Sequence, residues 1–362
     1  MMLRGNTGRN ESRFSRQAFG GRFGASGGAD LGQAAINKAC LSKLPERLFN
    51  PTEPTAPKKV DLSFDKSNDD ERWWEVTELT RLIVANNALE ELDERIGDFG
   101  GLMVLDAHDN RLQLIPDQIG NLQNLTHLNL SGNQLITLPT AILALPALQD
   151  LNLSNNKITN LPSLGLLPKL LVLDFSSNSL TTLPDISTLT NLRKILINRN
   201  RLTSLPPTLT HLTSLQELDA SENQLPYIFS SSTTLPSLQI LNVRRNRLQA
   251  ISDGGIVKCP ALKELSLSFN ALRNVDEGFL EGASGLETLE LADNSLDVLP
   301  AGVLELKGLK RLDLSNNALT KLPPELGLLT DLNIVLLNGN PLRGLPPGGT
   351  TKLLRALKDR IP

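Results

Sequence analysis

The segment "LTRLIVANNAL" at residues 79–89 opens a series of related segments, and "LNIVLLNGNPL" at residues 332–342 closes it. Both fit the template L-x-x-L-x-L-x-x-N-x-L, in which Ile, Val, Phe or Ala replaces leucine at some positions. The template matches twelve times, with successive asparagines 22 to 24 residues apart and none replaced. A fixed period of this length indicates a stack of structural repeats. The twelve asparagines, called the ladder asparagines below, are Asn87, Asn110, Asn133, Asn156, Asn178, Asn200, Asn223, Asn246, Asn270, Asn294, Asn317 and Asn340.

The alternation of leucine with other residues in the template predicts a short strand, with leucines turned inward and the intervening side chains on the opposite, open face. Strands of successive repeats are expected to form a parallel sheet, about 4.8 Å apart. Each ladder asparagine falls where the chain leaves the strand, and its amide can satisfy buried backbone groups there. We therefore interpret the ladder asparagines as structural rather than as a binding site.

Proline stands six residues after eight of the ladder asparagines. Because proline fixes φ and lacks an N–H donor, we expect a tight, non-helical return on the convex side of each of these repeats. In the other four repeats the same position holds Asp93, Phe229, Ser252 and Asp276.

These repeats resemble the leucine-rich repeat family, and the resemblance covers residues 79–342. The short repeats that contain L-x-x-L-P are similar to the cytosolic Ras-group members of the family. The resemblance implies an α/β solenoid, a horseshoe with a parallel concave sheet and capped ends, and it implies protein binding. It brings no catalytic residues to carry over to this chain.

Both ends of such an array expose leucine and need caps. We expect residues 36–78 to hold a degenerate half-repeat, followed by an N-terminal cap in which Trp73 covers the first repeat. The twelve repeats occupy residues 79–346, and residues 347–362 are predicted to form a closing helix. Residues 1–35, rich in arginine and glycine, are predicted to be a disordered basic tail. A mitochondrial transit peptide and an RNA-binding tail stay open as alternatives.

The composition argues against several classes of function. A formal net charge of -3 with 21% charged residues provides no overall field toward nucleic acid or acidic membranes. No apolar run approaches the roughly 20 residues that span a bilayer, so no membrane association is expected. Cys40 and Cys259 are the only cysteines, too few for a disulfide framework, which indicates a reducing compartment. We expect a cytoplasmic protein, with the nucleus as the alternative.

The open face is predominantly acidic or amide between the last two strand leucines, but the sixth and eighth repeats are basic. Arg199 and Arg245 share one column two strands apart, and acids of the seventh repeat lie between them. Phe269 follows in the same column, and an aromatic beside arginine is typical of an interface hot spot. The candidate partner-binding residues are Arg199, Arg201, Asp219, Glu222, Arg244, Arg245, Arg247 and Phe269.

Two interpretations of this cluster stay open: a self-neutralised charged surface, or a patch that binds an acidic protein segment. Nucleic acid is disfavoured because the interleaved acids would repel phosphate. Asp106, His108 and Ser131 imitate a nucleophile with its base, but serine recurs in that column and an open sheet has no pocket that excludes water. Zinc bound by His108, His127 and a nearby aspartate is a minor alternative. We predict no catalytic, cofactor or metal site.

We therefore expect a non-enzymatic protein-binding scaffold or adaptor, monomeric, that uses the concave face of the solenoid. The family resemblance implies a role in intracellular signalling, with a small-GTPase pathway component as one class of partner. A regulatory subunit that targets a phosphatase, and a nucleic-acid-associated protein that uses the basic tail, are the alternatives.

Overall fold

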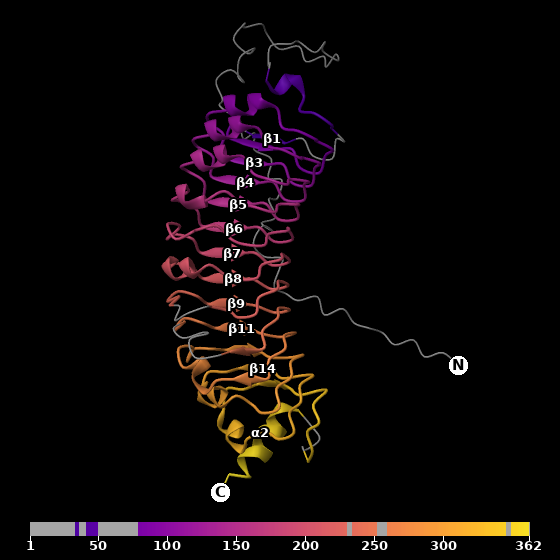
Figure 1. Cartoon of the computed structure of the whole chain (residues 1–362), viewed down its shortest axis with the longest axis vertical. Helices are drawn as coiled ribbons and strands as arrows, with labels where there is room; N and C mark the ends of the chain where they lie inside the picture. Colours follow the sequence, from indigo (N-terminus) through magenta and orange to yellow (C-terminus); the bar gives the residue numbers. More distant parts are fainter. Residues whose placement is uncertain are drawn as a thin grey trace, which may run out of the picture. The chain divides into compact units, whose positions relative to one another are not determined.

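The repeats form one open sheet of parallel strands. The computed structural model describes residues 33–35, 41–49, 79–229, 234–251, 259–344 and 349–361. Within these ranges, thirteen three-residue strands pair side by side in the order of the sequence (Figure 1). They are β1 (Gln33–Ala35), β2 (Arg81–Ile83), β3 (Val104–Asp106), β4 (His127–Asn129), β5 (Asp150–Asn152), β6 (Val172–Asp174), β7 (Lys194–Leu196), β8 (Glu217–Asp219), β9 (Ile240–Asn242), β11 (Glu264–Ser266), β13 (Thr288–Glu290), β14 (Arg311–Asp313) and β15 (Ile334–Leu336). The predicted solenoid with a parallel sheet is confirmed.

The register of the sheet aligns equivalent positions of successive repeats. Between β3 and β4, Leu105 pairs with Leu128, and Asp106 pairs with Asn129. Both leucines are buried, whereas Asp106 and Asn129 are partly exposed. The predicted alternation of inward leucines and open-face side chains is therefore present, and the first and third residues of each strand form what we call the strand face.

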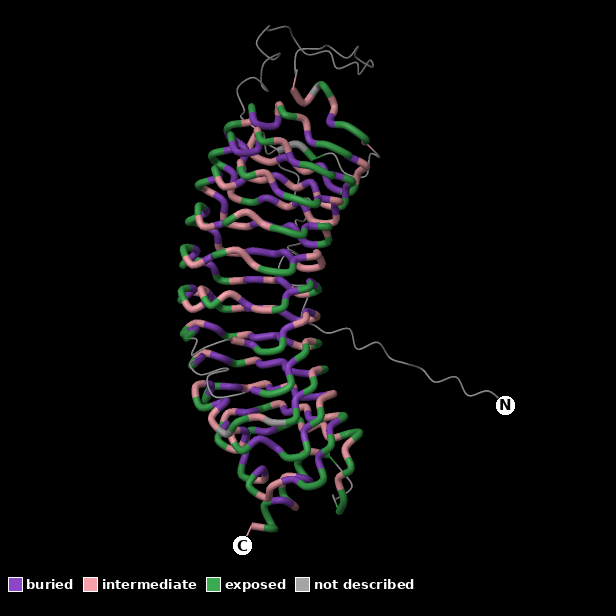
Figure 2. Tube along the Cα trace, viewed as in Figure 1, coloured by how far each residue is buried: buried purple, intermediate pink, exposed green. Residues whose placement is uncertain are grey.

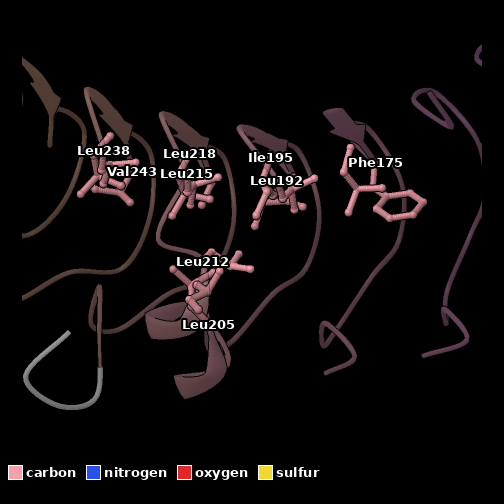
Figure 3. Close-up of a cluster of buried hydrophobic side chains, with 14 of the residues drawn as sticks. Phe175, Leu192, Ile195, Leu205, Leu212, Leu215, Leu218, Leu238 and Val243 are labelled. Atoms are coloured by element: carbon pink, nitrogen blue, oxygen red, sulfur yellow. The ribbon is translucent and has the colours of Figure 1, made fainter. Parts of the chain in front are cut away.

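The apolar core lies between the sheet and the return segments and is continuous along the array. Figure 2 shows buried positions recurring from repeat to repeat. In Figure 3, Leu192 and Ile195 of one repeat stand beside Leu215 and Leu218 of the next, and all four are at most 1% exposed. Because each repeat packs on its neighbours, the core is a stack of nearest-neighbour contacts.

The return segments are mostly short 3₁₀ helices. They are η2 (Glu46–Leu48), η4 (Glu94–Asp98), η5 (Asp117–Asn121), η6 (Thr140–Ala144), η7 (Leu164–Leu166), η8 (Pro207–His211), η9 (Glu277–Leu280), η10 (Ala301–Glu305) and η11 (Pro324–Leu328). Proline is the N-cap residue of η5, η6, η8, η10 and η11, with φ between -57° and -69°. The prediction of a non-helical return is therefore wrong in these five repeats, because the fixed φ and missing N–H of proline also suit the start of a 3₁₀ turn. Within the described residues, the return after Pro184 contains no helix, as predicted.

The return changes in the three consecutive repeats that lack this proline. Two short strands, β10 (Ala250–Ile251) and β12 (Asn274–Val275), pair as a second parallel sheet. Residues 230–233 and 252–258 lie outside the described residues, and Ser252 is among them. Strands β9, β11 and β13 nevertheless keep the register of the main sheet.

One further repeat precedes the twelve. Strand β1 pairs with β2 in the same parallel manner as the later strands, and residues 41–49 continue as its return. Ala88 donates its N–H to the carbonyl of Leu41 (2.9 Å), and Leu44 is buried. Residues 33–35, predicted above as part of the basic tail, form β1. They supply the strand that the half-repeat predicted from residue 36 lacked.

Two predicted features of the N-terminal region lie outside the described residues. They are residues 1–32 of the basic tail and the cap that contains Trp73. Strand β2 is nevertheless not an edge of the sheet, because β1 pairs with it.

Helix α2 (Thr350–Lys358) follows the last repeat and packs on η11. Leu353 and Leu357 are buried at this contact. Gly327 of η11 is essential to the close approach, because a Cβ atom there would lie 2.5 Å from the backbone nitrogen of Lys358. None of the helices in the described part of the chain is long and apolar enough to span a membrane.

Candidate protein-binding edge of the sheet

The side chains of the ladder asparagines form hydrogen bonds that join each turn to the preceding repeat. Asn133 Nδ2 donates to the carbonyls of Leu130 (2.9 Å) and Ala107 (3.0 Å), which belong to its own and the preceding repeat. Its Oδ1 accepts the N–H of Leu112 (3.0 Å), and the side chain is buried. The same three bonds recur in other repeats, for example around Asn223. The asparagine amides are therefore used by the fold, as predicted.

The residue immediately before each ladder asparagine, called the turn position, has a left-handed backbone, with φ between 51° and 76° in all twelve repeats. Asparagine, aspartate and glycine adopt this conformation most readily. They fill the turn position in seven repeats, as Asn86, Asp109, Gly132, Asn155, Asp293, Asn316 and Gly339. The other five repeats carry Ser177, Arg199, Glu222, Arg245 and Phe269. Repeats six to nine thus place four large side chains where the left-handed conformation costs about 1–2 kcal/mol.

These four residues, Arg199, Glu222, Arg245 and Phe269, form what we call the edge row. Glu222 joins the two arginines, since Arg199 Nε lies 3.2 Å from its Oε2 and Arg245 Nη1 lies 3.6 Å from its Oε1. Arg245 Cζ lies 5.0 Å from the centroid of the Phe269 ring. The side chains of Arg199 and Arg245 are 62% and 51% exposed, and Phe269 is 37% exposed. The row is therefore both connected and open to solvent.

Arg244 adds a second guanidinium to the Phe269 ring. It occupies a column that holds serine, alanine or asparagine in most repeats, and its Cζ lies 4.5 Å from the ring centroid. Its Nε is buried and has no hydrogen-bond partner. Among the described residues no carboxylate forms an ion pair with it. Arg244 is therefore held against an aromatic ring rather than against an acid.

Three predicted site residues lie apart from the edge row. Asp219 lies on the strand face of β8, where its Oδ1 accepts the Ser221 N–H (2.9 Å) and burial raises the pKa of its carboxyl. Arg201 and Arg247 follow a ladder asparagine by one residue and are exposed. The residues that the structure brings together are Arg199, Glu222, Arg244, Arg245 and Phe269.

The strand face beside the edge row carries both paired and unpaired charges. Glu264 of β11 has no ion pair among the described residues, and burial together with the nearby carboxylates of Glu290 and Glu217 raises its pKa. Lys194 Nζ lies 2.7 Å from Oε2 of Glu217 on the next strand. Asp174 accepts a serine hydroxyl at 2.7 Å, and burial raises the pKa of its carboxyl. This part of the face fits the interpretation of a self-neutralised surface. The edge row differs, because two guanidiniums share the single carboxylate of Glu222 and the third, that of Arg244, lies against Phe269.

The side chains that imitate a catalytic or zinc site are paired separately. His108 Nδ1 lies 2.7 Å from Asp106 Oδ1, and this hydrogen bond raises the pKa of His108. Ser131 donates its hydroxyl to an asparagine two residues earlier (2.9 Å), and His127 Nε2 lies 2.7 Å from Asp150. No group of three or more potential metal ligands occurs in the described ranges. Ser131 therefore has no hydrogen bond to either of these histidines among the described residues. His127 Nδ1 instead lies 2.8 Å from the hydroxyl of Thr126, which also donates to the carbonyl of Met103.

Two features of the site were missed by sequence reasoning. The left-handed turn position has a sequence signal, namely the recurrence of Asn, Asp and Gly directly before the ladder asparagine. The contact of Arg244 with Phe269 has no such signal, because it joins different columns of neighbouring repeats.

The architecture defines a class of protein: an open solenoid of parallel strands, built from repeats of 22 to 24 residues that are joined by the hydrogen bonds of the ladder asparagines. The family model described as "Leucine rich repeat" matches residues 77–135, 100–158, 236–296 and 284–342, which together cover more than half of the chain. The chain belongs to the leucine-rich repeat family.

Solved structures share this fold. A leucine-rich repeat protein of Leptospira interrogans is 32% identical, with a TM-score of 0.74 over 86% of this chain and 73% of that one. YopM, a leucine-rich effector protein from Yersinia pestis, is 26% identical, with a TM-score of 0.56 over 76% of this chain and 77% of that one. A TDR receptor is 26% identical, with a TM-score of 0.61, and the match covers 77% of this chain and 54% of the receptor chain.

Proposed function

We propose that the protein is a non-enzymatic protein-binding scaffold or adaptor, and that the edge row with Arg244 is the centre of its contact surface. The observation that carries the proposal is that the turn positions of four consecutive repeats have a left-handed backbone and yet carry large side chains. Unfavourable backbone conformations cluster where the side chain serves binding or catalysis. Arginine beside a partly buried aromatic is also the composition of interface hot spots. Membership of the leucine-rich repeat family supports protein binding in general.

The partner segment at this surface is acidic. Arg199, Arg244 and Arg245 bring three positive charges, and Glu222 brings one negative charge. Complementary charge steers the encounter and excludes basic partners. A continuous polyanion such as nucleic acid fits less well, because its successive phosphates would extend beyond the edge row onto the neighbouring strand face, where carboxylates repel them.

Charge reversal tests this proposal. The double variant Arg199→Glu, Arg245→Glu is expected to lower the recovery of co-purifying proteins at least tenfold, measured by mass spectrometry on the tagged full chain. Arg111→Glu is the matched control, because Arg111 is also exposed but lies in the second repeat. Circular dichroism establishes that both variants are folded. Unchanged recovery with the folded double variant removes the edge row as the contact surface.

The identity of the recovered partner decides the more specific role. A small-GTPase pathway component supports intracellular signalling, and a phosphatase catalytic subunit supports a targeting role. The segments "ERWWE" (71–75), "LMVLDAHDNRL" (102–112), "LNVRRNRL" (241–248) and "DRIP" (359–362) resemble leucine-rich repeat-containing protein 40. We propose that the chain is a cytoplasmic monomer of that group. Sedimentation velocity tests the monomeric state. Salt-dependent RNA binding by residues 1–60 would instead favour the nucleic-acid alternative.

A further inference from the structure

Arg244 and Arg245 converge on one aromatic ring. Their Cζ atoms lie 4.5 Å and 5.0 Å from the centroid of Phe269. A guanidinium held at a ring by cation–π attraction keeps its N–H donors free for other acceptors. The ring therefore gathers two forked donor groups at one place without using up their hydrogen-bonding capacity.

The hydrogen-bonding needs of Arg244 are unmet. Its Nε is buried without an acceptor, and no carboxylate pairs with it among the described residues. Buried charged donors are ordinarily paired with an acid or with several acceptors. Because Nε is closed to solvent, an acceptor that enters beside Phe269 would meet the Nη donors of Arg244, for which the described residues provide no hydrogen bond or ion pair.

The charge balance favours a doubly charged acceptor. Arg199 and Arg245 flank the carboxylate of Glu222, and Arg244 lies against the Phe269 ring, so the edge row and Arg244 together carry a surplus of two positive charges. A phosphate monoester carries about -1.5 to -2 at neutral pH, whereas a carboxylate carries only -1. Phosphate also offers three oxygens to the forked guanidinium donors.

From these observations we infer that Arg244 and Arg245, gathered by Phe269, form an anchor site for a phosphorylated serine or threonine of the protein partner. The inference rests on the proposed function and specifies the chemistry of the acidic segment. The partner's phosphate accepts hydrogen bonds from both guanidiniums, and Phe269 holds the two arginines in place for it.

Side-chain NMR tests the site directly. The Nε–Hε signals of the ¹⁵N-labelled full chain are followed while N-acetyl-phosphoserine amide is added at constant ionic strength. We expect saturable shifts of the Arg244 and Arg245 signals, and binding of N-acetyl-aspartate amide at least roughly tenfold weaker. Arg244→Gln is expected to weaken phosphoserine binding about tenfold, the loss of one charge-assisted bidentate contact, whereas Arg111→Gln leaves it unchanged. Equal affinity for the two probes, or equal shifts at Arg111, would overturn the inference.

The inference and the proposed function can fail separately. Partner recovery that depends on Arg245 and disappears when the lysate is treated with phosphatase supports both. Recovery that depends on Arg245 but survives phosphatase treatment keeps the proposed function and overturns the phosphate site. Recovery that charge reversal leaves unchanged removes the proposed contact surface itself.

Discussion

Exchanging arginine and asparagine at two turn positions tests whether the left-handed backbone of the edge row opposes folding. Arg199 has φ of 56°, and its exposed side chain pairs with Glu222. Asn155, two repeats earlier, has φ of 54° and an exposed side chain. We expect Arg199→Asn to raise the free energy of unfolding and Asn155→Arg to lower it.

The expected changes in the free energy of unfolding follow from two opposing effects. Asparagine relieves about 1 kcal/mol of the left-handed penalty that arginine meets. The ion pair lost with Arg199 is largely exposed and contributes about 0.5 kcal/mol. Arg199→Asn should therefore stabilise by about 0.5 kcal/mol. Asn155→Arg should destabilise by about 1 kcal/mol, because the neighbouring turn positions, Gly132 and Ser177, provide no carboxylate to pair with it.

Equilibrium urea denaturation followed by circular dichroism measures both changes, with the slope of the transition as a check that the same structure unfolds. The two variants should differ by about 1.5 kcal/mol in the free energy of unfolding. The reasoning is refuted if Arg199→Asn is less stable than the wild-type chain while Asn155→Arg equals it.

Single substitutions elsewhere in the array are expected to change stability or amide hydrogen exchange in a defined direction. Asn133→Ala leaves buried backbone groups without partners and should lower the free energy of unfolding by about 3 kcal/mol, against less than about 0.5 kcal/mol for exposed Thr137→Ala; similar losses in urea denaturation would contradict this. The hydrogen bond between His108 and Asp106 raises the pKa of His108. The contribution of protonated His108 to the free energy of unfolding is therefore complete below its unfolded pKa of about 6.5, and it is lost as pH rises through the raised folded value. The wild-type advantage over His108→Gln should accordingly be larger at about pH 5.5 than at about pH 8.5, and a pH-independent difference would count against it. Gly327→Ala forces a Cβ against the backbone of α2 and should speed amide hydrogen exchange throughout α2, whereas Gly308→Ala, with no atom within 4 Å, should not.

Periodic leucines and asparagines predict the sheet and its register, since both depend on residues repeated at a fixed spacing. Strand β1 departs from the template, with Ala34 where other strands carry leucine and Ala39 where the ladder asparagine would fall. The pattern could therefore indicate only half of that repeat. The 3₁₀ returns were not predicted because proline is equally compatible with a loop and with the first residue of a turn.

The predicted column of Arg199 and Arg245, two strands apart, is present, and one carboxylate of the seventh repeat lies between them. Asp219 was a weaker choice, because its carboxylate accepts the N–H two residues later. The recurring Asp-x-Ser pattern signals this bond, which also forms in the fifth and eleventh repeats. The contact of Arg244 with Phe269 depends on side-chain torsions, which a pattern of residue types does not encode.

The edge row also sets a length scale for a segment that lies along it. Its side chains project from adjacent strands about 4.8 Å apart, so the row extends about 14 Å. Three turns of an α-helix rise about 16 Å, which overshoots the row by only about 2 Å. In an extended chain, side chains on one side recur about every 6.6 Å, and three such steps overshoot by about 5 Å. Side chains on one side of a helical segment can therefore lie close to all four side chains of the edge row, whereas those of an extended segment are spaced too widely to do so.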